Sequence, residues 1–340
     1  MRHTTAPRPG VTRPEPRYGP PDMRILVTTT SFQDTPGAHH DVLRDSGFEI
    51  VRARGPLAEA QLLELLAGDG FDGILNGDDA ITARVIDAAL PRLRVIAKYG
   101  IGLDSIDCAH AKARSIPVLY TPGVNHTTVA EHTFGLMIAL SKHFWSHLRS
   151  TKAGQWKRTT GSELAGKRLA FLGLGRIGKE VARRAAAFDM QLVAHDPQWD
   201  DAFAAAHGVT RAASLDDAVR DADVISLHMN LGAGNRKWLD AARIATLKRG
   251  ALVINTARGG LVDEAAVAEA CRSGALGGYA TDVLEAEPPP ADHVFAGIDN
   301  IIVTPHVGSR TFESVERQGL RAARNIVNFL SGDADFIRAH

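Results

Sequence analysis

The sequence predicts an α/β protein with two doubly wound parallel sheets, one in each of two Rossmann-like domains. Short apolar runs alternate with helix-like stretches, which is typical of parallel sheets covered by helices on both faces. The alternation occurs in two separate series along the chain. A length of 340 residues also suits about two domains of roughly 100–200 residues each.

The composition is that of a globular protein with balanced charge. Lys+Arg and Asp+Glu both number 39, so nothing indicates nucleic acid or an anionic membrane as a partner. The longest apolar runs, such as residues 136–140, fall far short of the ~20 residues that cross a bilayer. Cys108 and Cys271 cannot form a disulfide framework and are most simply small buried residues. We expect a cytoplasmic protein that has no metal site.

Residues 1–22 differ from the rest of the chain. They contain six prolines and four arginines, and they lack both the apolar core of a signal peptide and the amphipathic period of a transit peptide. We expect a disordered basic tail.

The first series of elements begins after the tail. Its apolar runs predict strands at residues 24–29, 48–52, 73–75, 95–98 and 118–120. Residues 57–66 and 82–90 are helix-like, and the first of these stretches shows the helical period clearly. A long amphipathic helix is expected to follow at residues 129–148.

The second series predicts six more strands, at residues 168–172, 192–195, 224–227, 252–255, 278–283 and 301–304. A helical segment, residues 312–330, comes after them. It can pack on either unit, which allows the first domain to be discontinuous.

Three glycines stand between a strand and a helix in GLGRIG, residues 173–178. A strand-like run, 169–172, enters the motif and a helix-like run, 179–188, leaves it. One glycine turns the chain, the next lets the backbone approach a pyrophosphate, and the third lets the helix pack close to the strand. The helix N-terminus offers N–H groups to the phosphates. This context predicts a Rossmann-like dinucleotide site at Gly173, Gly175, Arg176, Ile177 and Gly178.

The next strand, 192–195, ends at Asp196. Its carboxylate can accept hydrogen bonds from both ribose hydroxyls and would repel a 2′-phosphate. NAD is therefore the favoured cofactor, although Arg176 and His195 leave NADP open.

Polar residues follow three of the later strands. Arg258 lies in NTARGG, Glu287 in DVLEAEP and His306 in VTPHVG. Doubly wound sheets bind their ligands at such strand ends. Each residue alone could be a surface arginine, a loop carboxylate or a histidine satisfied in a turn. Together they form a coherent set, because Arg can grip a carboxylate, His titrates near neutral pH and Glu can hold and charge the His.

Several motifs carry a resemblance to a known family. They are KYGIGLDSID (98–107), TPGVN (121–125), VAEHTFGLMIAL (129–140), AGQW (153–156), FLGLGRIG (171–178), NTARGGLVDE (255–264), ATDVLEAEP (280–288) and TPHVGS (304–309). On these motifs the chain from about Met23 onward resembles the D-2-hydroxyacid dehydrogenases. It is most similar to the D-3-phosphoglycerate dehydrogenase branch.

The resemblance implies roles for many residues. Arg258, Glu287 and His306 would be the catalytic trio, and Asp282 would contact the nicotinamide amide. Backbone N–H groups of the loop 98–102, with Lys98, Tyr99, Gly100 and Ile101, would hold the substrate carboxylate. Further cofactor contacts are expected at Met229, Thr256, Ala257, His306 and Gly308.

The resemblance also implies the organisation of the molecule. A substrate domain (residues 23–122 with 310–340) and an NAD-binding domain (123–309) would enclose the active site in a cleft between them. The family's dimers form mainly through the cofactor domain, so we expect a homodimer in which the helix 129–148 is both linker and interface. The chain ends at His340, so no C-terminal regulatory domain is expected.

The implied reaction is hydride transfer between nicotinamide and C2 of a 2-hydroxy or 2-oxo acid. Lys98, Asn76, His126 and a partner subunit's Lys157 could meet a second anionic group, which favours 3-phosphoglycerate as the substrate. Glyoxylate, hydroxypyruvate and other phosphorylated or phosphonate acids are the alternatives.

Two other functional classes stay open on the motifs alone. Some transcriptional corepressors resemble this family and use NAD(H) binding to control partner association. Formate dehydrogenase shares the two-domain plan, but its substrate has no C2 carbonyl. The chain also departs from the family at Asn230, where proline is usual, and at residues 232–234, so this loop can contact the cofactor differently.

Overall fold

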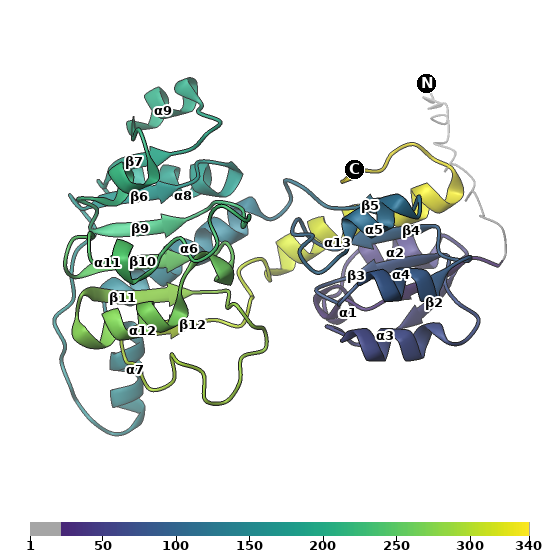
Figure 1. Ribbon diagram of the computed structural model, residues 1–340, viewed down its shortest axis with the longest axis horizontal. Coiled ribbons are helices and arrows are strands. Elements are labelled where there is room, and N and C mark those ends of the chain that lie inside the picture. Colours follow the sequence, from purple (N-terminus) through teal and green to yellow (C-terminus); the bar gives the residue numbers. More distant parts are fainter. Residues whose placement is uncertain (1–21, 340) are drawn as a thin grey trace, which may run out of the picture. The chain divides into compact units, whose positions relative to one another are not determined.

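The computed structural model describes residues 22–339, which form two compact units (Figure 1). Among the described residues, unit 1 comprises 22–124 and 312–339, and unit 2 comprises Asn125–Thr311. The tail predicted for residues 1–22 lies outside the described residues, apart from Asp22. The cleft expected between two domains stays a prediction.

Unit 1 is a five-stranded parallel sheet in the order β2-β1-β3-β4-β5. All five predicted strands are present, each within two residues of its expected ends. They are β1 (Arg24–Val27), β2 (Glu49–Arg52), β3 (Gly73–Asn76), β4 (Val95–Lys98) and β5 (Val118–Leu119). Such an order is that of a doubly wound sheet.

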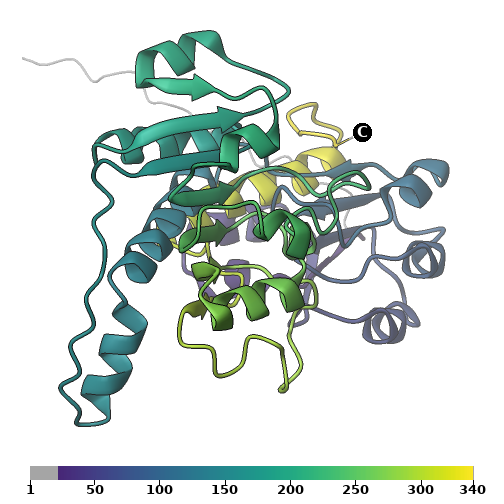
Figure 2. The same ribbon diagram turned by 60° about the vertical axis from the view of Figure 1, so that its left-hand side comes forward.

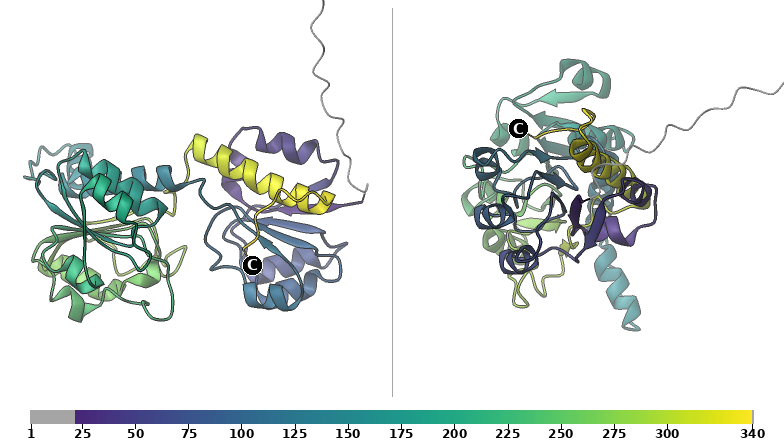
Figure 3. Two further views of the ribbon diagram at one scale, coloured as in Figure 1. Left: turned by 90° about the horizontal axis from the view of Figure 1, so that it is seen from above. Right: turned by 90° about the vertical axis from the view of Figure 1, so that its right-hand side faces the viewer.

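Helices cover both faces of this sheet (Figure 3). One face packs on α1 (Thr30–Asp34), α2 (His39–Arg44) and α13 (Phe312–Ser331). The other face packs on α3 (Glu59–Leu66), α4 (Ala83–Ala89) and α5 (Cys108–Ala113). The C-terminal helix α13 therefore joins unit 1, through Ala322, Ala323 and Ile326.

Unit 2 is a seven-stranded parallel sheet in the order β12-β11-β10-β9-β6-β7-β8. Its strands are β6 (Arg168–Leu172), β7 (Gln191–His195), β8 (Val209–Arg211), β9 (Val224–Leu227), β10 (Ala251–Asn255), β11 (Leu276–Thr281) and β12 (Ile301–Val303). Edge strand β8 was not predicted, because only one of its three residues is buried. The chain reverses its direction of winding between β6 and β9, which is where such sheets bind ligands.

Two helical layers cover this sheet as well. One contains α6 (His126–Ser141), α8 (Arg176–Ala186) and α9 (Asp201–His207). The other contains α10 (Leu215–Val219), α11 (Ala241–Ile244) and α12 (Glu264–Ser273), and a short 3-10 turn, η1 (Gly259–Leu261), follows β10.

The single helix predicted at residues 129–148 is wrong in two respects. The chain forms α6 and then a separate helix, α7 (Phe144–Lys152), because His143 adopts a left-handed conformation with φ 52°. Helix α6 is also buried around much of its circumference rather than amphipathic. Helix α7 extends away from the sheet of unit 2 (Figure 2).

Three further observations bear on the class of protein. No helix in the described part of the chain is long and apolar enough to cross a membrane. Residues 22–339 contain no cluster of three or more His, Cys, Asp or Glu that could hold a metal ion. Cys271 is buried as expected, Cys108 is partly exposed, and both are free thiols.

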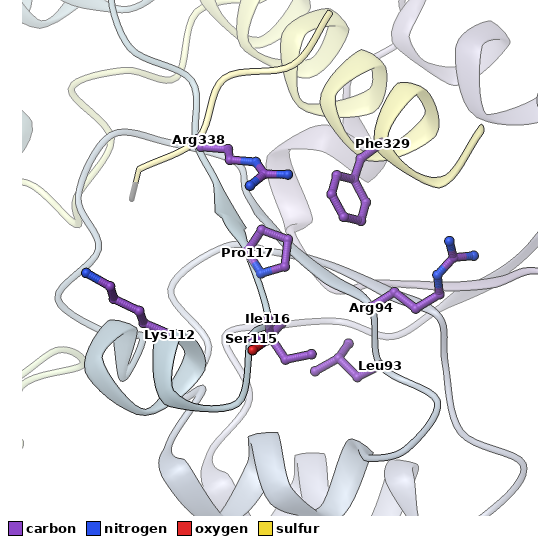
Figure 4. Close-up of a pocket in the computed structure, with 8 residues that line it drawn as sticks. All are labelled: Leu93, Arg94, Lys112, Ser115, Ile116, Pro117, Phe329 and Arg338. Atoms are coloured by element: carbon purple, nitrogen blue, oxygen red, sulfur yellow. The ribbon is translucent and has the colours of Figure 1, made fainter. Parts of the chain in front are cut away.

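Unit 1 has a shallow cavity of about 590 Å³ where β4 and β5 begin (Figure 4). Its lining includes the apolar Leu93, Ile116 and Phe329 and the basic Arg94, Lys112 and Arg338. It lies at the amino ends of the strands, opposite the edge that carries Asn76 and Lys98. None of the predicted site residues lines it.

Candidate functional site

The glycine-rich turn between β6 and α8 has the geometry that its sequence predicts. Gly173 has φ +100°, and a Cβ there would lie 2.8 Å from the carbonyl carbon of His228. A Cβ on Gly178 would lie 2.6 Å from the carbonyl oxygen of Gly173, so this glycine allows α8 to pack against the turn. A Cβ on Gly175 would meet nothing within 4 Å. Nothing in the described part of the protein therefore requires glycine at 175, which fits the close approach of a ligand.

Asp196 lies directly beside this turn. Its Oδ2 accepts a hydrogen bond from the N–H of Leu174 at 2.6 Å, and its Oδ1 accepts one from the N–H of Gln198 at 2.7 Å. The carboxylate is thus fixed next to the glycine-rich turn, where a ribose would follow the pyrophosphate. His195 instead faces the sheet edge, since its Nδ1 lies 3.2 Å from the carbonyl oxygen of Ala212.

A partly buried histidine, which the sequence did not single out, packs against the same turn. His228 follows β9, and its Nε2 lies 2.8 Å from Ser226 Oγ. Its ring stacks near Phe171, with 6.1 Å between centroids. Burial lowers the pKa of His228 from 6.5 to about 4, so the ring is neutral near pH 7. The neutral ring of His228 therefore packs against the turn and adds no charge there.

Arg258 extends from a tightly bonded turn after β10. Asn255 Nδ2 donates to the carbonyl of Arg258 at 2.9 Å, and Asn255 Oδ1 accepts from the N–H of Ala257 at 3.0 Å. A Cβ on Gly259 would lie 2.0 Å from the carbonyl carbon of Leu284, so only glycine fits where the two segments cross. Thr256 Oγ1 lies 2.7 Å from Thr133 Oγ1 on α6. The backbone that carries Arg258 is therefore held on several sides.

Glu287 and His306 form a direct pair. His306 Nδ1 lies 2.7 Å from Glu287 Oε2, and Glu287 Oε1 accepts from the N–H of Leu284 at 2.8 Å. The His306 and Glu287 side chains are 43% and 35% exposed, so the pair is open to a ligand. A carboxylate on Nδ1 fixes that nitrogen as the donor, so that any proton exchange by the ring takes place at Nε2.

The backbone around His306 is strained and is held by Asp282. His306 has φ 51°, a left-handed conformation that is uncommon for residues other than glycine. Its N–H donates to the carbonyl of Asp282 at 3.0 Å. The carboxylate of Asp282 accepts from the N–H of Val307 at 2.9 Å and from the N–H of Gly308 at 2.7 Å. One buried side chain therefore sets the position of the whole turn.

The carboxylate of Asp282 has further donors. Thr304 Oγ1 donates to its Oδ1 at 2.6 Å, and His132 Nε2 on α6 lies 2.9 Å from Thr304 Oγ1 and 3.4 Å from Asp282 Oδ1. Burial alone would raise the pKa of Asp282, but hydrogen bonds from His132, Thr304, Val307 and Gly308 hold that pKa below its ordinary value. Its Oδ2 has one donor among the described residues, the N–H of Gly308, and keeps an acceptor position for the predicted contact with an amide.

The predicted substrate residues of unit 1 lie at the carboxyl edge of its sheet. Asn76 and Lys98 are register partners at the ends of β3 and β4. Both are buried, and the Lys98 ammonium donates to the carbonyl of Gly77 and, at 2.7 Å, to the carboxylate of Asp78. Lys98 is thus already paired with an acidic neighbour, which the sequence did not indicate.

The loop 98–102 offers fewer N–H groups than expected. The N–H of Tyr99 donates to the carbonyl of Asn76 at 2.9 Å, and that of Gly100 donates to Thr121 Oγ1 at 3.0 Å. The N–H groups of Ile101 and Gly102 have no hydrogen-bond partner among the described residues. An anion at this loop would therefore bind at Ile101 and Gly102.

Comparison with known proteins matches this geometry to one family. The family model described as "D-isomer specific 2-hydroxyacid dehydrogenase, NAD binding domain" matches residues 134–308, just over half of the chain. The chain belongs to this family.

Relatives with named activities are similar over most of the chain. A D-3-phosphoglycerate dehydrogenase from Methanocaldococcus jannaschii is 36% identical over 92% of the chain, but the chain spans only 58% of that relative's length. A hydroxypyruvate reductase from Thermotoga maritima is 39% identical over 74% of the chain and 82% of the relative. The TT0316 protein from Thermus thermophilus superposes with a TM-score of 0.84 at 35% identity, over 94% of this chain and all of the other.

These findings confirm the predicted family, its likeness to the phosphoglycerate dehydrogenase branch, the two parallel α/β sheets and NAD as the family's cofactor. The NAD binding domain of the family model falls within unit 2. That unit contains the predicted cofactor residues and the trio Arg258, Glu287 and His306. The predicted substrate residues Asn76, Lys98, Tyr99, Gly100 and Ile101 all belong to unit 1. His126 and Lys157, which were expected to meet a second anion, belong to unit 2.

Proposed function

We propose that the chain is an NAD-dependent D-2-hydroxyacid dehydrogenase that interconverts a 2-hydroxy acid and its 2-oxo acid. The observation that carries this proposal is the His306–Glu287 pair, 2.7 Å between Nδ1 and Oε2, in the NAD binding domain of a dehydrogenase family. A histidine held by a carboxylate at one ring nitrogen is suited to exchange a proton through the other.

The residues of unit 2 fit a bound dinucleotide. Gly175 leaves the N-terminus of α8 open to a pyrophosphate, and Asp196 is fixed beside it as a ribose acceptor. The proposed contacts are Gly173, Gly175, Arg176, Ile177, Gly178, Asp196, Met229, Thr256, Ala257, Asp282, His306 and Gly308. When bound, the nicotinamide of NADH supplies hydride for C2 of the 2-oxo acid.

The residues of the chain supply binding and proton transfer. Arg258 grips the substrate carboxylate and polarises the neighbouring carbonyl, because a guanidinium offers two parallel donors. Protonated His306 gives its proton to the oxygen that develops on C2, and Glu287 stabilises the imidazolium before this step. In the opposite direction neutral His306 takes the hydroxyl proton. In unit 1, the N–H groups of Ile101 and Gly102 hold the substrate carboxylate.

We also propose a homodimer in which α7 and the segment after it contact a second copy. Four large apolar side chains here are exposed: Phe144 (48%), Trp145 (51%), Leu148 (57%) and Trp156 (78%). Leu148 lies four residues after Phe144 and three after Trp145, so it shares a helical face with both. Exposed apolar patches of this kind mark interaction surfaces. The two free thiols fit a reducing cytoplasm, where we place the protein.

The proposed function is tested by following NADH oxidation with purified protein and a panel of acids. The panel holds hydroxypyruvate, glyoxylate, pyruvate, 2-oxoglutarate, phosphohydroxypyruvate and phosphonopyruvate, with NAD and formate as a separate reaction. Turnover of at least one 2-oxo acid is expected. Tight NADH binding without turnover of any acid would contradict the proposal and favour a cofactor-sensing, partner-binding protein. Turnover of formate would favour formate dehydrogenase.

A further inference from the structure

The loop after β3 in unit 1 carries two adjacent carboxylates with different roles. Asp79 is fully buried and accepts hydrogen bonds from Thr28 Oγ1 at 2.5 Å, the N–H of Leu57 at 2.7 Å and the N–H of Gly77 at 2.9 Å. These bonds fix the loop to the neighbouring strand β1 and to the start of α3. Asp79 therefore sets the position of its neighbour Asp78.

Asp78 covers the ammonium of Lys98. The two side chains are 2.7 Å apart, yet Lys98 is 4% exposed and Asp78 is 68% exposed. A buried ammonium needs a partner, and Asp78 supplies it from the solvent side. An anion that approaches Lys98 from solvent meets the carboxylate of Asp78 first.

Asn76, beside Lys98, adds an acceptor to this edge. Its Nδ2 donates to the carbonyl of Gly77 at 2.9 Å, which identifies the other amide atom as the oxygen. That oxygen is buried and has no hydrogen-bond partner among the described residues. Such an acceptor suits a ligand that donates, such as a hydroxyl group, and does not suit a phosphate dianion.

We propose that Asp78 is a specificity-determining residue that selects against 2-oxo acids with a second anionic group. It does so by neutralising Lys98 and by presenting its own negative charge at the carboxyl edge of this sheet. This inference rests on the proposed function, in which unit 1 binds the substrate beside the loop 98–102. The enzyme then prefers hydroxypyruvate or glyoxylate to phosphohydroxypyruvate.

The size of the expected effect follows from electrostatics. A like charge at a separation of several Å, with an effective dielectric constant of about 20, changes affinity by about tenfold to a hundredfold. Removing the carboxylate also frees Lys98 to bind the phosphate. Both effects raise the activity with phosphohydroxypyruvate relative to the activity with hydroxypyruvate.

The test compares kcat/KM for phosphohydroxypyruvate and hydroxypyruvate in wild type, Asp78→Asn and Asp78→Ala. The control is Asp69→Asn, which removes an even more exposed carboxylate (89%) from the opposite end of the same strand. We expect the ratio of phosphohydroxypyruvate to hydroxypyruvate activity to rise about tenfold to a hundredfold in both Asp78 variants and to stay constant in the control. In a Lys98→Met background, Asp78→Asn should raise the ratio less, because only the loss of the like charge then acts.

The outcomes separate this inference from the proposed function. If wild type reduces hydroxypyruvate and the ratio changes by less than about twofold in both Asp78 variants, the inference is wrong and the proposed function stands. A wild type that already prefers phosphohydroxypyruvate would also overturn it. A wild type that reduces no acid of the panel overturns the proposed function and the inference with it. Thermal melting and NADH binding identify any variant that has failed to fold.

Discussion

His306 Nδ1 lies 2.7 Å from Glu287 Oε2, and the same carboxyl group accepts from the N–H of Leu284 through its other oxygen. Both oxygens of Glu287 are thus used to place one imidazole ring. Replacing His306 should therefore lower activity more than replacing Glu287.

His306→Ala should lower kcat by about 10²–10⁴-fold, the usual contribution of a positioned proton donor. Glu287→Gln keeps the shape and removes the charge, so the loss should be smaller, about tenfold to a hundredfold for one charge-assisted hydrogen bond. Steady-state kinetics with the best acid of the panel, together with NADH titration by fluorescence, measures both. Equal losses of turnover and of NADH binding would show that the variants disturb the cofactor site instead.

The glycines of the 173–178 turn provide a matched pair of substitutions. A Cβ on Gly178 would lie 2.6 Å from the carbonyl oxygen of Gly173, whereas one on Gly175, which has φ −71°, would meet nothing. Gly178→Ala should therefore destabilise unit 2 by about 1–3 kcal/mol through overpacking. Gly175→Ala should leave stability unchanged or raised by about 0.4–1 kcal/mol and should weaken NADH binding. Urea unfolding and NADH titration on both variants separate the two roles. Wild-type NADH affinity in Gly175→Ala would contradict a pyrophosphate at this position.

Much of the fold follows from local pattern, and the misses have physical causes. The buried parallel strands of both sheets are continuous apolar runs, so their positions could be predicted. The break at His143 could not, because it depends on a left-handed backbone conformation within a sequence that is helical on both sides. Strand β8 has a single buried residue and hence no apolar signal.

The site was predictable where function dictates residue type at a strand end, as for Arg258, Glu287 and His306. It was not predictable where a contact joins distant segments. His132 on α6 reaches Thr304 across 172 positions of the sequence, and Asp78 reaches Lys98 across 20. The available signals were His132, in a largely buried helix, and the acidic pair Asp78 and Asp79, directly after a buried strand. Neither signal indicates its partner without the fold.

The carboxylate of Asp196 predicts the choice between cofactors. Replacing it in Asp196→Asn removes the repulsion of a 2′-phosphate and weakens one acceptor for the ribose, while the amide oxygen can still accept from the N–H of Leu174 or Gln198. The ratio of kcat/KM for NADPH to that for NADH should rise about tenfold to a hundredfold, which corresponds to one charged hydrogen bond. Kinetics with both cofactors measures this ratio. A ratio that stays at its wild-type value would mean that Asp196 only fastens the turn.

The exposed face of α7 predicts the oligomeric state. Trp145→Glu with Leu148→Glu places two charges on a face that we propose to be buried in a dimer, so the dimer should dissociate. Light scattering coupled to size exclusion gives the mass, and wild type should have twice the mass of the variant. Val294→Glu serves as the control, because Val294 is another exposed apolar residue of unit 2, at 41%. A wild type with the mass of one chain would contradict the dimer.

The partly buried ring of His228 predicts how the stability of unit 2 depends on pH. Its pKa is about 4 in the folded protein against 6.5 for an ordinary histidine, so between these values the unfolded chain binds a proton that the folded chain does not. The stabilisation is therefore fully present above about pH 6.5 and is lost as the pH falls toward about 4, a total of about 3 kcal/mol. His228→Gln keeps a polar partner for Ser226 and does not titrate, so its unfolding free energy should fall less over this range. All four tryptophans lie in unit 2, so their fluorescence during urea unfolding follows this unit. If the unfolding free energies of wild type and variant changed equally between about pH 4 and pH 7, His228 would take up its proton as readily in the folded chain as in the unfolded one.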